Sequence, residues 1–286
     1  KKEVKGFSGI THVLMSVALL LIVFIFLEGD AREILLDTSW QLTTIAIIIA
    51  GGAALLPDLD NDESTAGYQL GFIGTFIGIF MKATAMMIHN LYHTKKDRPP
   101  KSAHRLFWHT PFSAILIFLL FWFFMPTGNE TGWAFLTNGF NGNILEFLIE
   151  NTTFVIGLFI IFISAMLGSD TALYWLFKLI KIRSFFKTLI NSLLPLLVIV
   201  LVIMMPLDHI RMLTLVAALG YFFHILGDFL TQGSVSIIWP IPFKGQAWYQ
   251  PWILGPFQIY TGGVVNTMMN FVFLGMIVIA GTLVFL

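Results

Sequence analysis

Histidine and aspartate side chains, which are common ligands of divalent metal ions, lie close to the ends of several apolar segments of this sequence. One pair, His224 and Asp228, is four residues apart within the apolar run 213–230. Residues with this spacing share one face of a helix, and an uncompensated carboxylate inside a membrane is costly. We therefore expect the pair to bind a metal, or Asp228 to orient His224. A purely structural hydrogen bond is the alternative.

An acidic segment follows the apolar run 40–57. Pro57 stops the helix, and four carboxylates then occur within six residues, at Asp58, Asp60, Asp62 and Glu63. Carboxylates this close repel one another unless a cation neutralises them, and hard cations prefer oxygen ligands. The segment lacks the glycine and the distal glutamate of an EF-hand. A solvated acidic loop is the alternative to a metal site.

The segment 104–110 places His104, Arg105 and His109 directly before a long apolar run. Imidazole is a frequent zinc, iron or manganese ligand, and a guanidinium can bind phosphate or carboxylate with two hydrogen bonds. An ordinary basic membrane anchor would explain Arg105 well and the histidines poorly. His12, at the start of the first apolar run, indicates little by itself.

His89 and His93 also have a spacing that would suit a metal. They adjoin Lys95 and Lys96 in a segment expected at the surface, which favours an ordinary surface role for these histidines.

The elements that must position these residues are membrane helices. Of the 286 residues, 57 % are hydrophobic and only 11 % are charged, compared with about 25 % charged in an ordinary globular protein. The apolar runs do not alternate as the strands of a membrane barrel would. We expect an all-α polytopic protein with a single integral membrane domain, 1–286. Zero net charge gives no indication of a nucleic-acid partner, and the absence of cysteine excludes disulfides and thiolate ligands.

About seven transmembrane helices are predicted, together with one re-entrant or in-plane segment, 67–93, for which a short buried hairpin is an alternative. In that segment Gly67, Gly71, Gly74 and Gly78 fall on one helical face and Lys82 interrupts the apolar run. The other long connection, 233–262, is rich in Trp, Pro and Gly and is expected at the membrane interface. The expected spans are 8–28, 40–57, 106–126, 150–172, 188–207, 211–232 and 263–286.

Basic residues mark the cytoplasmic side of a membrane protein. Lys1, Lys2 and Lys5 therefore predict a cytoplasmic N-terminus, and the basic cluster 95–105 is cytoplasmic only if 67–93 does not cross. In this topology all the candidate ligands fall at cytoplasmic helix ends. Several histidines and acids could then converge, which suits a two-metal site.

Three motifs together resemble the YdjM-like family of bacterial and archaeal inner-membrane proteins. They are Leu56-Pro57-Asp58-Leu59-Asp60, His104-Arg105-x-x-x-His109-Thr110 and His224-x-x-x-Asp228-x-x-Thr231-x-x-Gly233. Members are described as membrane-bound metal-dependent hydrolases, some as LexA-binding. The family pattern His-Arg-Gly-x-Thr-His-Ser is altered here, because Leu106, Trp108 and Thr110 replace its glycine, threonine and serine.

The residues and the resemblance imply a metal-dependent hydrolase in a bacterial or archaeal cytoplasmic membrane, acting at its cytoplasmic face on a phosphoester of a lipid or another amphiphilic substrate. One to three divalent ions, zinc or manganese, are expected, with Arg105 and Asp60 as catalytic residues. Expected partners are membrane lipid or a lipid-linked substrate, and a protein partner where the LexA-binding description applies. Alternatives are a metal-ion or proton-coupled transporter, and a non-catalytic anchor for a regulatory partner. The expected metal ligands are His12, Asp58, Asp60, His104, His109, His224 and Asp228.

Overall fold

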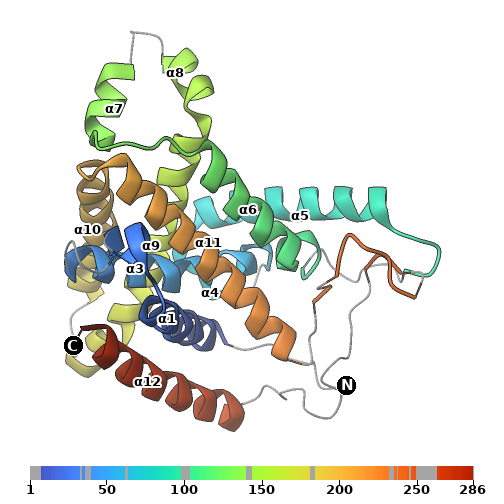
Figure 1. The fold of residues 1–286 in the computed structure, drawn as a ribbon. Coiled ribbons are helices and arrows are strands. Elements are labelled where there is room, and N and C mark those ends of the chain that lie inside the picture. Colours follow the sequence, from blue (N-terminus) through green and yellow to red (C-terminus); the bar gives the residue numbers. More distant parts are fainter. Residues whose placement is uncertain are drawn as a thin grey trace.

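The chain folds into a bundle of α-helices, joined by turns and short 3-10 helices (Figure 1). Among the residues that the structure describes there is no strand, only isolated bridges. The all-α prediction is confirmed, and the chain is a multi-pass helical membrane protein. The structure is a computed structural model that describes residues 8–32, 34–35, 40–61, 64–97, 104–139, 144–180, 184–231, 235–236, 238–244, 246–248 and 263–285.

Each of the seven predicted spans contains a helix. In the described residues, five helices are long and apolar enough to cross a membrane, and three further apolar helices are shorter. One of the five, Phe72–Tyr92, lies in the segment 67–93 and the other seven helices lie in the predicted spans. The largest difference in bounds concerns α9, which continues well past residue 172, where the predicted span ended. The helices are α1 (Gly9–Ile25), α3 (Trp40–Ala53), α6 (Pro111–Phe124), α9 (Thr152–Ile180), α10 (Ser184–Ile203), α11 (Leu207–Leu230) and α12 (Gly263–Phe285).

Helix α3 lies at the centre of the bundle, packed against α9, α11 and α1. Small residues let α3 and α9 approach until their backbones touch, as is common between membrane helices. A Cβ on Gly52 would lie 1.7 Å from the carbonyl oxygen of Ser164, and one on Gly168 would lie 2.1 Å from that of Ile48. Either glycine could therefore be replaced only if the two helices moved apart.

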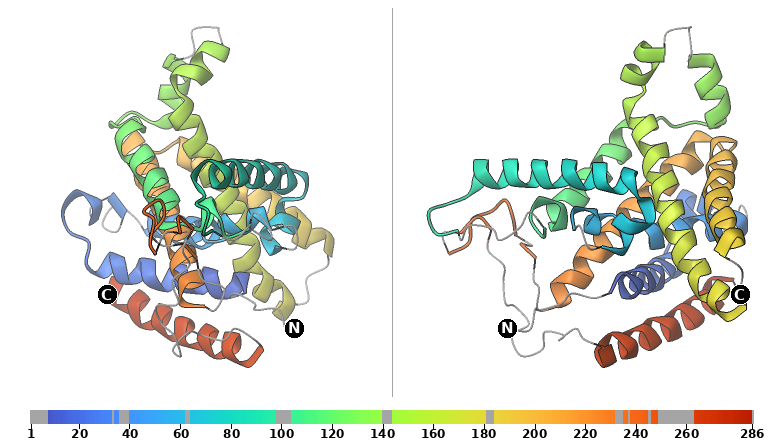
Figure 2. Two further views of the ribbon diagram at one scale, coloured as in Figure 1. Left: turned by 90° about the vertical axis from the view of Figure 1, so that its right-hand side faces the viewer. Right: turned by 180° about the vertical axis from the view of Figure 1, so that it is seen from behind.

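The segment 67–93 contains a short helix, α4 (Thr65–Leu70), and then one continuous helix, α5 (Phe72–Tyr92). Gly71 joins them with a φ of 55°, which favours glycine. Most of α5 is exposed, so the segment is not a short buried hairpin. Figure 2 shows α5 lying across α9 rather than alongside it, an arrangement that fits an in-plane helix, although α5 is also long enough to cross a membrane.

The two ends of the bundle differ. Three short helices, α2 (Gly29–Arg32), α7 (Gly132–Gly139) and α8 (Ile144–Glu150), lie in connecting segments. Of these, α7 and α8 project from the end of the bundle at which α6 ends and α11 begins (Figure 1). Backbone hydrogen bonds fasten that end, from Leu207 N to Glu130 O and from Gly132 N to Met205 O. The candidate metal ligands gather at the opposite end.

Candidate metal centre

The seven predicted ligands come together where α6 begins and α11 ends. They are carried by α1, by α11 and by two 3-10 helices, η2 (Pro57–Asp60) and η3 (Phe107–His109), with His104 in the turn before η3. Their side chains are linked by contacts of less than 4 Å. Two groups of three residues stand out, because each offers ligand atoms that lie within 4.8 Å of one another.

The first group, which we call the deep group, consists of His12, His224 and Asp228. All three side chains are almost completely buried. The Nε2 atoms of His12 and His224 lie 3.6 Å and 3.5 Å from the Asp228 carboxylate, and the two imidazole rings stack with their centroids 3.9 Å apart. His224 Nδ1 lies 2.6 Å from the carbonyl oxygen of Ala54. Because a carbonyl only accepts, His224 Nδ1 donates and Nε2 keeps its lone pair for a metal.

The second group, which we call the outer group, consists of Asp58, His104 and His109. About a fifth to a quarter of the Asp58 and His104 side chains is exposed, at 21 % and 24 %, whereas His109 is buried. His109 Nε2 lies 3.7 Å from Asp58 Oδ1.

Asp60 contacts both histidines of the outer group. Its Oδ1 atom accepts a hydrogen bond from His104 Nδ1 at 2.6 Å, and its Oδ2 atom lies 3.5 Å from His109 Nδ1. Asp60 as a whole is only 2 % exposed. A carboxylate bonded to the second nitrogen of a ligand histidine fixes the ring and raises its basicity. Asp60 is thus placed to orient His104 as well as to bind a metal itself.

The deep and outer groups form one centre. His109 Nε2 lies 3.7 Å from Asp228 Oδ2, and His224 Nε2 lies 3.6 Å from Asp58 Oδ1. Each aspartate therefore faces histidines of both groups, as a carboxylate shared between two ions would. This pairing of sites suits a two-metal arrangement.

The donor atoms fit a divalent metal. His109 Nε2, His224 Nε2 and Asp228 Oδ2 are buried and have no hydrogen-bond partner, which is costly for polar atoms unless another ligand satisfies them. Two ligand atoms about 2.0–2.1 Å from a tetrahedral zinc ion lie roughly 3.4 Å from each other. The separations of 3.5–3.7 Å between histidine nitrogens and aspartate oxygens come close to that value.

Arg105 lies beside the deep group rather than in open solvent. Its terminal nitrogen donates to Asp228 Oδ1 at 3.2 Å, and 17 % of its side chain is exposed. Arg105 has a φ of 64°, in the left-handed region that non-glycine residues rarely adopt. Strained backbone of this kind tends to occur at functional sites. Here the turn sends His104 toward Asp60 and Arg105 toward Asp228.

Two residues that we did not predict from the sequence hold η3 in place. The Tyr221 hydroxyl on α11 donates to the carbonyl oxygen of Trp108, and Trp108 Nε1 donates to Met81 O and Thr84 Oγ1 on α5. Trp108 precedes His109 in η3, so these hydrogen bonds tie the His109 segment to both α11 and α5. Only the polar hydroxyl of Tyr221 inside an apolar helix could have indicated this role.

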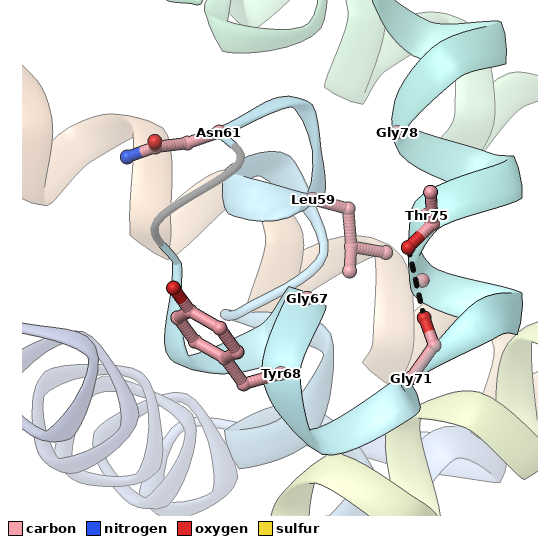
Figure 3. Close-up of a pocket in the computed structure, with 8 residues that line it drawn as sticks. Leu59, Asn61, Gly67, Tyr68, Gly71, Thr75 and Gly78 are labelled. Carbon is pink, nitrogen blue, oxygen red and sulfur yellow. Dashed lines mark hydrogen bonds between the residues drawn. The ribbon is translucent and has the colours of Figure 1, made fainter.

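A cavity of about 190 Å³ adjoins η2 on the side of α4 and α5. Figure 3 shows Leu59 pointing toward Thr75, and the cavity is lined largely by the glycines of α4 and α5. Among the described residues, no histidine or acidic side chain lines it. Leu59 lines the cavity, and its two neighbours in the sequence, Asp58 and Asp60, belong to the metal centre.

The remaining residues singled out in the sequence lie elsewhere. His89 is buried and His93 is exposed near the end of α5, and neither belongs to the two ligand groups. Thr231 ends α11, where its hydroxyl donates to the carbonyl oxygen of Asp228. Asp62, Glu63 and Gly233 lie outside the described residues.

The fold and the centre define a multi-pass helical membrane protein with buried histidine and aspartate groups that could hold a metal ion. The model of the family described as YdjM inner membrane protein matches residues 7–180, more than half of the chain. The chain therefore belongs to the YdjM inner membrane protein family. The matched part includes the outer group and His12 and ends before His224 and Asp228. None of the curated proteins and none of the solved structures matches this chain.

Proposed function

We propose that this protein is a metal-dependent hydrolase that acts on a phosphoester of an amphiphilic substrate at the cytoplasmic face of the membrane. One observation carries the proposal: the deep and outer groups share a single centre, in which Asp58 and Asp228 each face histidines of both groups. Two ions held side by side are a frequent arrangement in enzymes that hydrolyse phosphoesters.

The side chains divide the work as follows. His12, His224 and Asp228 would hold one ion, and Asp58, His104 and His109 the other. The ions, zinc or manganese, would polarise a phosphoryl oxygen and lower the pKa of a water molecule. Asp60 keeps His104 oriented, and its Oδ2 atom can accept a proton. The guanidinium of Arg105, next to Asp228, can bind an anionic oxygen of the substrate.

The surroundings of the centre support an amphiphilic substrate. The cavity beside η2 offers about 190 Å³ next to the ligand-bearing turn, enough for part of an apolar chain. Tyr68 and Phe72, on the same α4–α5 segment, are 74 % and 84 % exposed. Tyrosine is enriched at membrane interfaces, and exposed apolar rings such as these would suit contact with lipid, so a lipid-linked phosphoester could reach the centre from the bilayer.

The test is hydrolysis by purified protein loaded with zinc or manganese. We expect turnover of a lipid phosphoester that is lost in Asp228→Ala and retained in His209→Ala, a matched control near the other end of α11. Metal-loaded wild-type protein that hydrolyses no lipid or soluble phosphoester would contradict the proposal. So would an Asp228→Ala variant that keeps full activity.

A further inference from the structure

Two sequence features that the metal centre does not use meet beside it. His89, near the end of α5, lies against Trp248, with ring centroids 5.3 Å apart. Trp248 stacks on Trp239 with centroids 5.1 Å apart, and the rings of Trp239 and Phe107 in η3 meet in a T-shaped arrangement at 5.4 Å. His89 and two tryptophans of the connection thus form one row of rings that reaches Phe107, at the start of η3. We call His89, Trp239 and Trp248 the aromatic row.

All three members of the row carry a buried ring nitrogen with no hydrogen-bond partner. These atoms are His89 Nδ1, Trp239 Nε1 and Trp248 Nε1, and the side chains of His89 and Trp239 are 5 % and 6 % exposed. A buried donor without an acceptor costs about 1–3 kcal/mol. A ligand that supplies hydrogen-bond acceptors would satisfy three such atoms in adjacent rings.

The chemistry of these atoms restricts the ligand. An indole nitrogen only donates, and His89 Nδ1 donates in one of its two tautomers. The rings of Trp239 and Trp248 stack on each other, and the His89 ring stacks on that of His93. These faces are therefore covered, which leaves little room for a cation that seeks an aromatic face. Oxygen atoms that accept two or three hydrogen bonds along the ring edges fit better, and a phosphoryl group offers several.

Charges near the row are mixed. Lys95 and Lys96 are exposed in the turn after α5. Asp97 lies in the same turn. Its carboxylate accepts hydrogen bonds from the backbone N–H group of Thr94 in that turn and from those of Ala247 and Trp248 in the tryptophan-rich connection. Burial alone would raise the pKa of Asp97, but these hydrogen bonds lower it. The carboxylate is therefore ionised and engaged with the loop, which it fixes against the end of α5.

We propose that the aromatic row is a phosphoryl-binding site, in which the ring N–H groups of Trp239, Trp248 and His89 bind the oxygens of a phospholipid headgroup or of free phosphate. The site goes beyond the proposed hydrolysis and needs no metal. The site contacts η3 through Phe107, and the same short helix carries His109 of the outer group.

The test is fluorine NMR of fluorotryptophan-labelled protein, freed of metal by a chelator and held in a maltoside detergent that contains no phosphate. Trp239→Phe and Trp248→Phe assign the two signals, and exposed Trp133 on α7 is the internal reference. Three probes are compared: dihexanoylphosphatidylglycerol, dihexanoylglycerol and inorganic phosphate.

We expect the Trp239 and Trp248 signals to move with the phospholipid and to stay in place with dihexanoylglycerol. A response to inorganic phosphate as well would support the site and identify free phosphate as a source. A response to the phospholipid alone would identify the headgroup. Signals that stay still with both phosphoryl probes, or that move equally with dihexanoylglycerol, would overturn the proposal.

The variants add a second measurement. Tryptophan to phenylalanine removes the N–H group and keeps an aromatic ring, so each variant should bind the phospholipid roughly ten- to hundredfold more weakly. Trp133→Phe should bind as the wild type does. Unchanged binding in both Trp239→Phe and Trp248→Phe would overturn the site. Because no metal is present, failure of the proposed hydrolysis would leave this result unaffected.

Discussion

The deep and outer groups use the same two residue types but are built in different ways. The deep group stands on two long helices, α1 and α11, and is almost completely buried. The outer group stands on short 3-10 helices and a turn, and two of its three side chains are partly exposed. Regular helices hold side chains more firmly than turns do. If the protein is the proposed hydrolase, the deep group would hold the more tightly bound ion, and the outer group would be the one that the substrate reaches.

The difference should appear most strongly when the deep group is removed. The double variant His224→Ala, Asp228→Ala deletes two of its three side chains and also the carboxylate that faces His109. We expect activity to fall more than roughly a hundredfold, beyond the about 10- to 100-fold typical of residues that only support ligands. Metal analysis and turnover measure this, with His209→Ala as the control. Normal metal content in the double variant would contradict the deep site.

Loss of an outer ligand should have a smaller effect on metal content. In His104→Ala we expect about one ion per chain to remain, because the deep group is untouched, and activity to fall about as far as in Asp58→Ala. A brief chelator wash followed by elemental analysis measures the ion that remains. Loss of both ions would show that the two groups are not separable, and the comparison would fail.

Gly227 allows a test of the deep group that leaves every ligand in place. A Cβ at this position would lie 2.6 Å from Met15 Cε and 3.0 Å from His12 Nδ1. Gly227→Ala should therefore displace His12 and lower the affinity of the deep group for its ion about tenfold, which is typical when the residues that orient a ligand are disturbed. Gly275→Ala on α12, where nothing lies within 4 Å, is the matched control for titration with zinc. Equal affinities in the two variants would argue against His12 as a ligand.

The smallest effect is expected at the fastening of η3. Tyr221→Phe removes the hydroxyl that donates to the carbonyl oxygen of Trp108, a hydrogen bond worth about 1 kcal/mol. The outer ion should then bind about fivefold more weakly, while the deep ion is unchanged. Tyr68→Phe, at an exposed position, is the control for the same titration. Weaker binding of the deep ion, with unchanged binding of the outer ion, would contradict the assignment of Tyr221 to the outer group.

Much of the fold follows from the sequence, because apolar runs of spanning length leave helices as the main solution in lipid. The convergence of His12, Asp58, His109 and Asp228 at one end also follows, since the basic residues placed their helix ends on one side. The segment 67–93 was less predictable. Its glycines indicated close packing, but not that α5 would be a single, mostly exposed helix.

The details of the centre needed the structure. Sequence spacing pairs His224 with Asp228. It cannot show that Asp60 accepts a hydrogen bond from His104, or that a turn with positive φ brings Arg105 to Asp228. These contacts join residues that are 44 and 123 positions apart, beyond any local pattern. The aromatic row was missed for the same reason, because His89 and Trp248 meet only in the folded chain.

Elemental analysis of the purified wild-type protein tests the central claim most directly. We predict about two zinc or manganese ions per chain after purification without added metal, one lost readily to a chelator and one lost slowly. Protein that is folded and carries no divalent metal, and takes up none when zinc or manganese is supplied, would contradict the account.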